Sequence, residues 1–212
     1  MADYTLRNTK GSELTFGEVD NNFIASRTTA RANGCNLITP PSGFWINQQW
    51  IAEDLTSVNA QVTTVVLTPF LLGYDLEIDR WGVWQITSNN LDVQFLIYSA
   101  NSEGKPSSRL AASSVIATGA AAGAKEEAVS FTFTANTLYW VGVHASSNES
   151  FRAIRQRSLK PLGLGTGLNT TAGLCSIQLG STNVGSAPAT WSFNVNQLNN
   201  PAGVIALNFR AA

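Results

Sequence analysis

Short segments in which every second residue is apolar dominate most of this chain. The alternation is clearest where Val129, Phe131 and Phe133 are separated by serine and threonine. A side-chain period of two is that of a half-buried β-strand, and clusters of turn-forming residues such as 101–106 separate the segments. On this basis nine strands are predicted: 61–70, 77–87, 92–99, 109–118, 128–134, 138–145, 174–179, 190–195 and 203–209.

Many short strands at close spacing, with no helical stretch between them, are typical of an all-β sandwich or jelly roll. The chain has 212 residues, of which 44% are hydrophobic, and this is enough for one sizeable β domain with an appendage. We therefore expect a jelly-roll-like antiparallel β-sandwich as a head domain at 44–212. The glycine-rich segment 156–173 has neither the Walker A nor the GxGxxG spacing, and we expect a long loop there.

Residues 10–26 carry the signals of a short helix ahead of this domain. Thr15 and Glu18 have the spacing of a capping box, in which each side chain pairs with the backbone amide of the other residue. Leu14, before the cap, would pack against Val19 as a hydrophobic staple, and Val19, Phe23 and Ile24 would form one apolar stripe. Because a helix this short is marginal in water, we expect it to need a partner.

A linker follows the helical segment. Gly34, the Pro40–Pro41 pair and Gly43 cannot continue a helix, so the domain boundary is expected near residue 43. The predicted organisation is an N-terminal arm at 1–43, with a short helix and a Pro/Gly linker, followed by the β-sandwich head.

Composition argues against several classes of function. Only 13% of residues are charged and the net charge is −1, which gives no electrostatic basis for binding nucleic acid or an anionic membrane. No apolar run reaches the length of a membrane span, and the N-terminus MADYTLRNTK lacks the apolar region of a signal peptide, so synthesis in a cytoplasm is expected. Cys35 and Cys175 are far apart in sequence and are expected to be free thiols.

The sequence offers no constellation that recommends catalysis. His144 is the single histidine, it falls in a predicted strand, and no Ser–His–Asp or Cys–His arrangement can be assembled around it. Glu126 and Glu127 would point to opposite faces of a strand, which argues against a joint role in glycoside hydrolysis. Three alternating carboxylates are interpreted as solvated charges and not as a calcium loop: Asp75, Glu77 and Asp79. We expect a protein that is not an enzyme, with no cofactor and no metal.

The chain is rich in tryptophan: Trp45, Trp50, Trp81, Trp84, Trp140 and Trp191. Trp81 or Trp84 must face inward if their strand is half buried, and Trp140 lies in the most apolar predicted strand. An exposed indole suits stacking against a sugar ring, but core packing is the simpler expectation for most of these side chains. Trp45 and Trp50, beside the linker, are candidates for a subunit interface.

The segment TLRNTKGSELTFGEVDNNF resembles the N-terminal segment of tailed-bacteriophage fibre and related virion proteins, in which a KGSPLTxxEVDxNF run recurs. Glu13 stands where proline is common in that family, and the match covers about the first tenth of the chain. The resemblance implies that this end attaches the protein to a virion. The residues that would form the attachment interface are Leu14, Thr15, Glu18, Val19, Asp20, Asn22, Phe23 and Ile24.

Later segments resemble the β-sandwich of phage fibre tips. In those proteins a DRIGI-like strand start precedes an IY pair, a glycine–proline turn and an LxxGtYW-like strand; here 79–83, 97–98, 104–106 and 138–140 occupy the corresponding places. Such proteins are usually homotrimers, and the resemblance implies a homotrimer here. It also implies a location in the virion, after synthesis in the host cytoplasm.

Three functions remain open on these grounds. The first is a short tail-fibre-type appendage that is joined to other virion proteins (tail, portal/adaptor or capsid) and whose head meets a host surface glycan or outer-membrane receptor. The second is a purely structural head fibre, decoration or adaptor protein without receptor binding. The third, a glycan-degrading depolymerase, is disfavoured because the sequence has no parallel β-helix repeat and no convincing acid pair.

Overall fold

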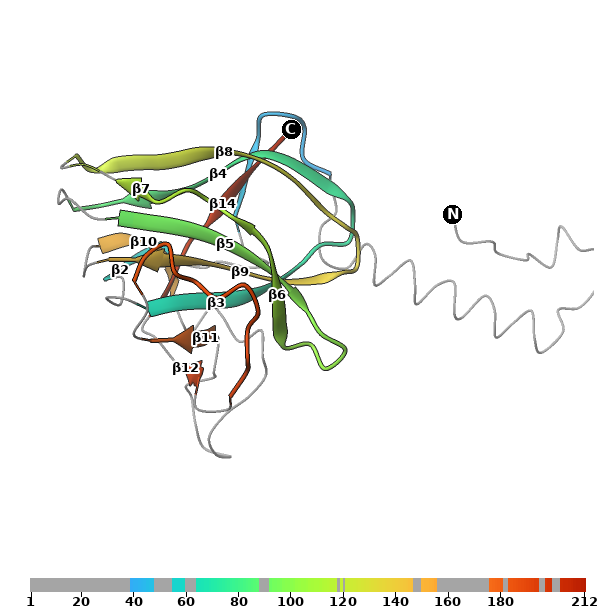
Figure 1. Ribbon diagram of the computed structural model, residues 1–212. Helices are drawn as coiled ribbons and strands as arrows, with labels where there is room; N and C mark the ends of the chain where they lie inside the picture. The colour runs from blue at the N-terminus through green and yellow to red at the C-terminus, as the bar shows by residue number, and fades with distance from the viewer. Residues whose placement is uncertain are drawn as a thin grey trace, which may run out of the picture.

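The protein is described from a computed structural model (Figure 1). The structure describes residues 39–47, 55–59, 64–87, 92–117, 119, 121–146, 150–155, 176–180, 183–194, 197–199 and 203–212. Within these residues the chain is all-β, with its strands in two antiparallel sheets that pack face to face as a sandwich. Residues 1–38 of the expected arm, including its predicted helix, lie outside the described residues, as does the predicted loop at 156–173.

The first sheet is built around one long central strand. Strand β4 pairs with β8 along one side, with β14 along the other, and with β10 at its end. Strand β14 also pairs with β1, while β10 pairs with β2 and β13. The strands of this sheet are β1 (Trp45–Asn47), β2 (Leu55–Asn59), β4 (Leu76–Gln85), β8 (Gly123–Phe133), β10 (Ser150–Arg155), β13 (Gly203–Ile205) and β14 (Asn208–Ala211).

The second sheet has the spatial order β12-β11-β3-β9-β5-β6, with β7 also paired to β5. Its central strands β9 and β5 are buried along almost their whole length. The strands of this sheet are β3 (Thr64–Leu71), β5 (Asp92–Ala100), β6 (Pro106–Ala112), β7 (Ile116–Ala117), β9 (Leu138–Ala145), β11 (Ser176–Leu179) and β12 (Leu198–Asn199).

The main core lies between the two sheets and is formed by the inward half of the alternating side chains. Phe70, Phe133 and Phe209 meet at its centre, with ring centroids 4.8 Å apart for Phe70 and Phe133 and 5.1 Å apart for Phe133 and Phe209. Trp81 packs edge-on against Phe95 at 5.7 Å. Edge-to-face contacts of this kind stabilise a core beyond the burial of area alone.

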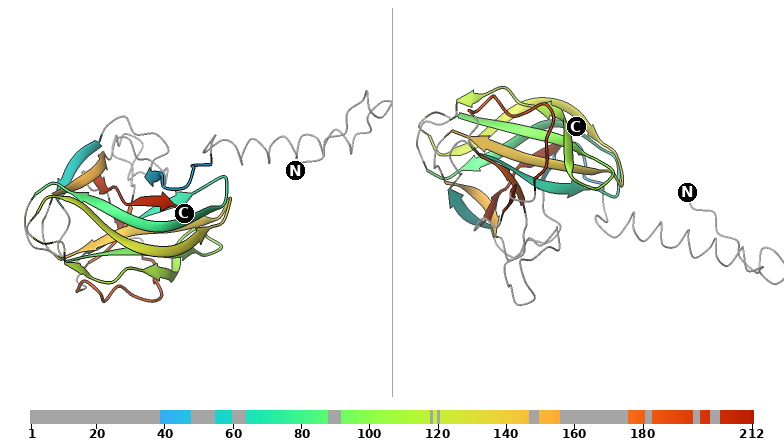
Figure 2. Two further views of the ribbon diagram at one scale, coloured as in Figure 1. Left: turned by 90° about the horizontal axis from the view of Figure 1, so that it is seen from above. Right: turned by 60° about the horizontal axis from the view of Figure 1, so that its bottom comes forward.

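A second apolar cluster lies on the outer face of the second sheet, where residues 183–194 cross it. We call this segment the strap; it is drawn in orange in front of that sheet in Figure 1 and below it in the left view of Figure 2. The Trp191 ring packs edge-on against Tyr98 at 5.4 Å, and the Tyr98 hydroxyl donates to the Pro188 carbonyl at 2.7 Å. The strap explains why β5 and β9 are apolar on both faces.

The observed strands agree with the sequence in the centre of each sheet and depart from it at the margins. The predicted strands 77–87, 92–99 and 138–145 are confirmed as β4, β5 and β9. The strand predicted at 190–195 is wrong, because 191–194 form the irregular end of the strap, whose ladder contact is an isolated bridge between Thr190 and Ser108. Its alternating pattern reflects packing of Trp191 onto the sheet.

Two further predicted strands are divided in the structure. The prediction at 109–118 corresponds to β6 and β7, and that at 203–209 corresponds to β13 and β14. In the second case Ala206 and Leu207 are buried between the two strands, so an apolar run that looks continuous contains a change of pairing partner. Strands β1, β2, β10 and β12 were not predicted.

Candidate functional site

Strand β4 presents its two tryptophans to opposite sides of the first sheet. Trp81 is 1% exposed and faces the core, whereas Trp84 is 50% exposed on the outer face. A β-bulge between Ile78 and Arg80, where β4 has one more residue than β14, shifts the pleat by one residue and brings both Ile78 and Trp81 to the core side. Trp84 follows Trp81 at an odd spacing and therefore points outward.

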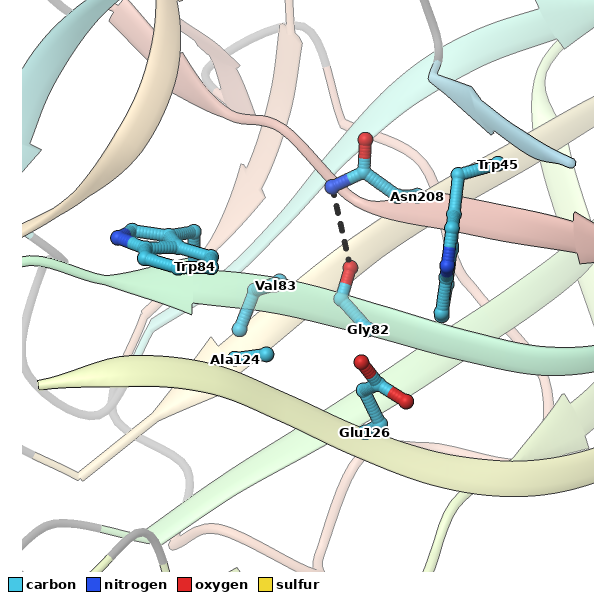
Figure 3. A pocket seen from close by; sticks show the side chains of 7 residues that line it. All are labelled: Trp45, Gly82, Val83, Trp84, Ala124, Glu126 and Asn208. Carbon is cyan, nitrogen blue, oxygen red and sulfur yellow. Dashed lines mark hydrogen bonds between the residues drawn. The ribbon is translucent and has the colours of Figure 1, made fainter.

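Trp84 borders a groove of about 280 Å³ on this outer face (Figure 3). Four strands supply its lining, and Trp45 from β1 stands across Gly82 from Trp84. The groove is therefore built on the rigid part of the sandwich. Its lining residues are Trp45, Gly82, Val83, Trp84, Ala124, Glu126 and Asn208.

Strand register explains why residues so distant in sequence meet here. Gly82 is paired with Asn208 of β14 on one side and with Glu126 of β8 on the other. A Cβ atom at position 82 would lie 2.9 Å from the Lys125 carbonyl oxygen and 3.0 Å from Glu126 Cγ. The glycine therefore permits close packing of β4 on β8 and leaves the floor of the groove without a side chain.

The polar groups of the groove keep part of their hydrogen-bonding capacity. Asn208 donates from Nδ2 to the carbonyl oxygens of Gly82, at 3.3 Å, and Ala206, at 2.9 Å. These bonds orient the amide and leave Oδ1 as an acceptor. Among the described residues, none accepts a hydrogen bond from the indole N–H of Trp45 or of Trp84.

Ion pairs border the groove. Glu126 Oε2 lies 3.7 Å from Arg80 Nη1, and Arg210 makes a two-point contact with Asp79 through Nε and Nη2. The hydrogen bond from Arg210 lowers the pKa of the Asp79 carboxyl, and the same bond raises the pKa of Arg210. The two arginines and two carboxylates carry formal charges that sum to zero.

Carboxylates are sparse among the described lining residues of the groove. Glu126 is the one carboxylate that lines the groove, whereas retaining and inverting glycosidases place two carboxyl groups across the scissile bond. Its neighbour Glu127 is turned to a different partner, since its Oε1 accepts hydrogen bonds from the backbone amide and hydroxyl of Ser114 at 3.1 and 2.8 Å. His144 is fully buried in β9 of the other sheet.

Metal sites and membrane-spanning helices have no candidate among the described residues. In the described part of the chain, no group of three or more His, Cys, Asp or Glu side chains is placed to hold a metal ion. The same part contains no helix long and apolar enough to cross a membrane.

Of the residues predicted to be functional, Trp45 alone lies in the described part of the chain. Trp45 lies at the groove and is 43% exposed, while Trp50 and the whole predicted attachment interface at 14–24 lie outside the described residues. Sequence reasoning missed Glu126 and Asn208 as neighbours of Trp45, because strand register alone brings them together. A signal for Trp84 was present in its spacing from Trp81.

No protein-family model matches this chain, and no curated protein matches it. Among solved structures, a chain from the crystal structure of the T13 viral particle of infectious bursal disease virus (IBDV) is similar at 10% identity and a TM-score of 0.32, over 80% of this chain and 35% of that chain. A chain of the VP2 subviral particle of the same virus is 12% identical with a TM-score of 0.30, over 79% of this chain and 41% of that chain. Similarity this low does not indicate a shared fold or a shared function.

Proposed function

We propose that this chain is a non-catalytic structural component of a tailed-phage virion, a short tail-fibre-type appendage attached by its N-terminal segment. The observation that carries the proposal is the run KGSELTFGEVDNNF, which combines a helix cap with an apolar stripe ahead of a β-sandwich. A short helix with that stripe needs a second surface on which to bury it. Another virion protein of the tail, portal/adaptor or capsid supplies that surface.

In this proposal the sandwich head recognises the host surface, and its two sheets have a jelly-roll-like topology. The support for host-surface recognition is the groove between Trp45 and Trp84, because two half-exposed indoles on one face of a sandwich are typical of a binding surface. A homotrimer would present three such grooves, and linkage of weak sites raises the overall affinity without any new contact.

A second candidate is a structural head fibre, decoration or adaptor protein without a receptor. It is favoured by the position of Phe44 and Trp45, which are 62% and 43% exposed where the N-terminal segment enters the sandwich. Phe44 and Trp45 would be buried if the subunits of an oligomer met where the N-terminal segment enters the sandwich. In this case Trp45 belongs to a subunit interface, as the sequence first indicated for Trp45 and Trp50.

The attachment role is tested with Phe23→Ala in virions. Burying Phe23 against a partner contributes about 1.5–3 kcal/mol, and the Thr15 cap contributes about 1 kcal/mol. We expect Phe23→Ala to lower the amount of protein in purified particles strongly while leaving the melting temperature of the isolated chain unchanged. Thr15→Ala combined with Phe23→Ala should nearly abolish incorporation.

Asn21→Ala is the matched control, since this position lies off the apolar stripe of the same segment. Normal incorporation of Asn21→Ala alongside loss of Phe23→Ala supports attachment. The reverse pattern for Phe23→Ala, a lower melting temperature with normal particle content, would mean that the segment packs on its own sandwich, and it contradicts the proposal.

A further inference from the structure

We propose that the groove between Trp45 and Trp84 binds one uncharged pyranose unit of a polysaccharide. The sugar ring stacks on the indoles, and Asn208 and Glu126 accept hydrogen bonds from its hydroxyl groups. This inference rests on the proposed function of the head and names the class of ligand that it recognises.

The aromatic side chains supply the first argument. Trp81, Trp140 and Trp191 are at most 5% exposed, whereas Trp45 and Trp84 are 43% and 50% exposed on the same outer face. The negative face of an indole attracts the weakly positive C–H groups on the flat side of a pyranose. Because β14 pairs with β1 and β4, the backbone positions that carry the two indoles are fixed before any ligand arrives.

The polar groups supply the second argument. The groove offers two acceptors, Asn208 Oδ1 and the Glu126 carboxylate, and one donor, the indole N–H of Trp45, whereas the N–H of Trp84 points away from the other lining residues (Figure 3). Sugar hydroxyls both donate and accept, so a pyranose matches this set. An aliphatic side chain of a partner helix would instead desolvate the carboxylate and the amide without replacing their bonds to water.

Charge indicates that the sugar is neutral. Arg80 is paired with Glu126 and Arg210 with Asp79, so these two cations already face an anion. No uncompensated positive charge among the described lining residues is available for a phosphate, sulfate or carboxylate group. An acidic sugar would also meet the Glu126 carboxylate directly (Figure 3).

Size limits the length of the ligand. The groove volume of about 280 Å³ is near the lower end of the roughly 300–1,000 Å³ that is usual for small-molecule sites. One ring fits between the indoles, and a longer glycan would continue into solvent. Binding of a single ring should therefore be weak, in the millimolar range, and several grooves would be needed for firm attachment.

The test uses the full chain and the indole N–H signals in a proton–nitrogen correlation spectrum, assigned with single Trp→Phe variants. The probes are the methyl glycosides of glucose, galactose, mannose, rhamnose and N-acetylglucosamine. With at least one probe, we expect saturable shifts of the Trp45 and Trp84 signals and none of the Trp81 and Trp191 signals. Trp84→Ala should weaken binding at least tenfold.

Leu110→Ala is the matched control, because Leu110 is a large apolar residue that is 47% exposed on β6 of the other sheet. Its affinity for the same glycoside should equal that of the wild-type chain. Absence of shifts with all five glycosides, or binding that survives Trp84→Ala, overturns the inference. Shifts that follow protein concentration instead of sugar concentration also overturn it, since a second copy would then cover the groove.

Failure of this inference is distinguishable from failure of the attachment proposal. Absence of glycoside shifts in the wild-type chain, together with loss of Phe23→Ala from particles, overturns the inference about the groove and leaves the attachment proposal supported. Saturable glycoside shifts, together with normal particle content of Phe23→Ala, contradict attachment and leave the inference about the groove supported.

Discussion

Gly142 lies in the middle of β9, between β3 and β5, where the backbones approach most closely. A Cβ atom at this position would lie 1.9 Å from the Val66 carbonyl oxygen and 2.9 Å from Leu67 Cδ2. The first distance is far shorter than any non-bonded contact, and the atom in the way belongs to the backbone. Even the smallest side chain would therefore push β3 away from β9 and disturb both apolar clusters.

Gly142→Ala is expected to lower the free energy of unfolding by about 3 kcal/mol, at the upper end of overpacking effects. Gly180→Ala is the matched control, because no atom lies within 4 Å of a Cβ at position 180, and its effect should stay within about 0.5 kcal/mol. Urea unfolding followed by tryptophan fluorescence gives both values. Equal midpoints for the two variants would show that β3 and β9 can separate without cost.

At the residue scale the sequence could predict which kinds of side chain are buried but not the phase of each strand. Alternation indicated that Trp81 or Trp84 faces inward. The choice of Trp81 depends on the bulge between Ile78 and Arg80, which arises from pairing with β14 and leaves no local signal in β4. The groove was missed for the same reason, since Glu126 and Asn208 become its neighbours through register with Gly82.

At the scale of elements, the strap ties the outer face of the second sheet to the C-terminal part of the chain. Trp191 donates its backbone amide to Ser107 at 2.7 Å, and Arg109 donates to Ala189 at 2.8 Å, so the strap is held along β6 as well as over β5. Tyr98 links β5 to the strap, because its hydroxyl donates a hydrogen bond to the Pro188 carbonyl. Burial raises the pKa of Tyr98 to about 12 from an ordinary value of 10.0, against a lowering effect of Arg109.

Tyr98 should make the stability of the protein depend on alkaline pH. The folded chain holds this proton up to about pH 12, whereas the unfolded chain loses it near pH 10, so the stabilisation is complete below pH 10 and declines as pH rises to about 12. In Tyr98→Phe this part of the decline should disappear, at a cost of about 1 kcal/mol at neutral pH for the lost hydrogen bond. Urea unfolding of both proteins across this range measures the difference. Parallel pH curves would contradict a buried, protonated Tyr98.

The elements that the sequence predicted correctly are those with a strong apolar pattern of their own. Strand β9 was predicted with its observed ends because it is apolar on both faces and bounded by turn residues. Strand β8 begins at Gly123, five residues before the predicted start at 128, since Ala, Lys and Glu are poor strand formers and the ladder with β4 holds them extended. The described residues 190–194 show the opposite case, in which a strand-like pattern packs on a sheet and forms an isolated bridge at Thr190 in place of a ladder.

At the scale of the whole molecule, the two ends of the described chain meet at the same sheet. Gly43 donates its amide to Ala211 at 2.8 Å, Ala211 donates to Phe44 at 2.9 Å, and β1 then pairs with β14. Figure 1 shows this N-terminal segment, in blue, beside the C-terminus. The groove is formed by this closure, because Trp45 comes from β1 and Asn208 from β14. Strand β1 thus contributes both to the sheet and to the groove.

This closure predicts where the chain can be shortened. A protein of residues 39–212 keeps Gly43, Phe44 and all of β1, so it should unfold cooperatively with a melting temperature within a few degrees of the full chain. A protein of residues 48–212 lacks β1, leaves the edge of β14 unpaired and removes one wall of the groove. Its melting temperature should be lower by about 4 °C or more, because a loss of 1 kcal/mol in the free energy of unfolding corresponds to roughly 2–4 °C at this size. This shorter protein should also lose sugar binding.

Near-ultraviolet circular dichroism and calorimetry distinguish the outcomes for both proteins. A sharp transition and a native tryptophan signal for 39–212 would show that the sandwich closes without the first 38 residues, as the sequence predicts for the head. A molten spectrum for 39–212 would place essential packing in the N-terminal arm and contradict its role as an attachment segment. Equal melting temperatures for 39–212 and 48–212 would mean that β1 adds nothing to the sheet, and Trp45 would then lack the fixed position that the groove requires.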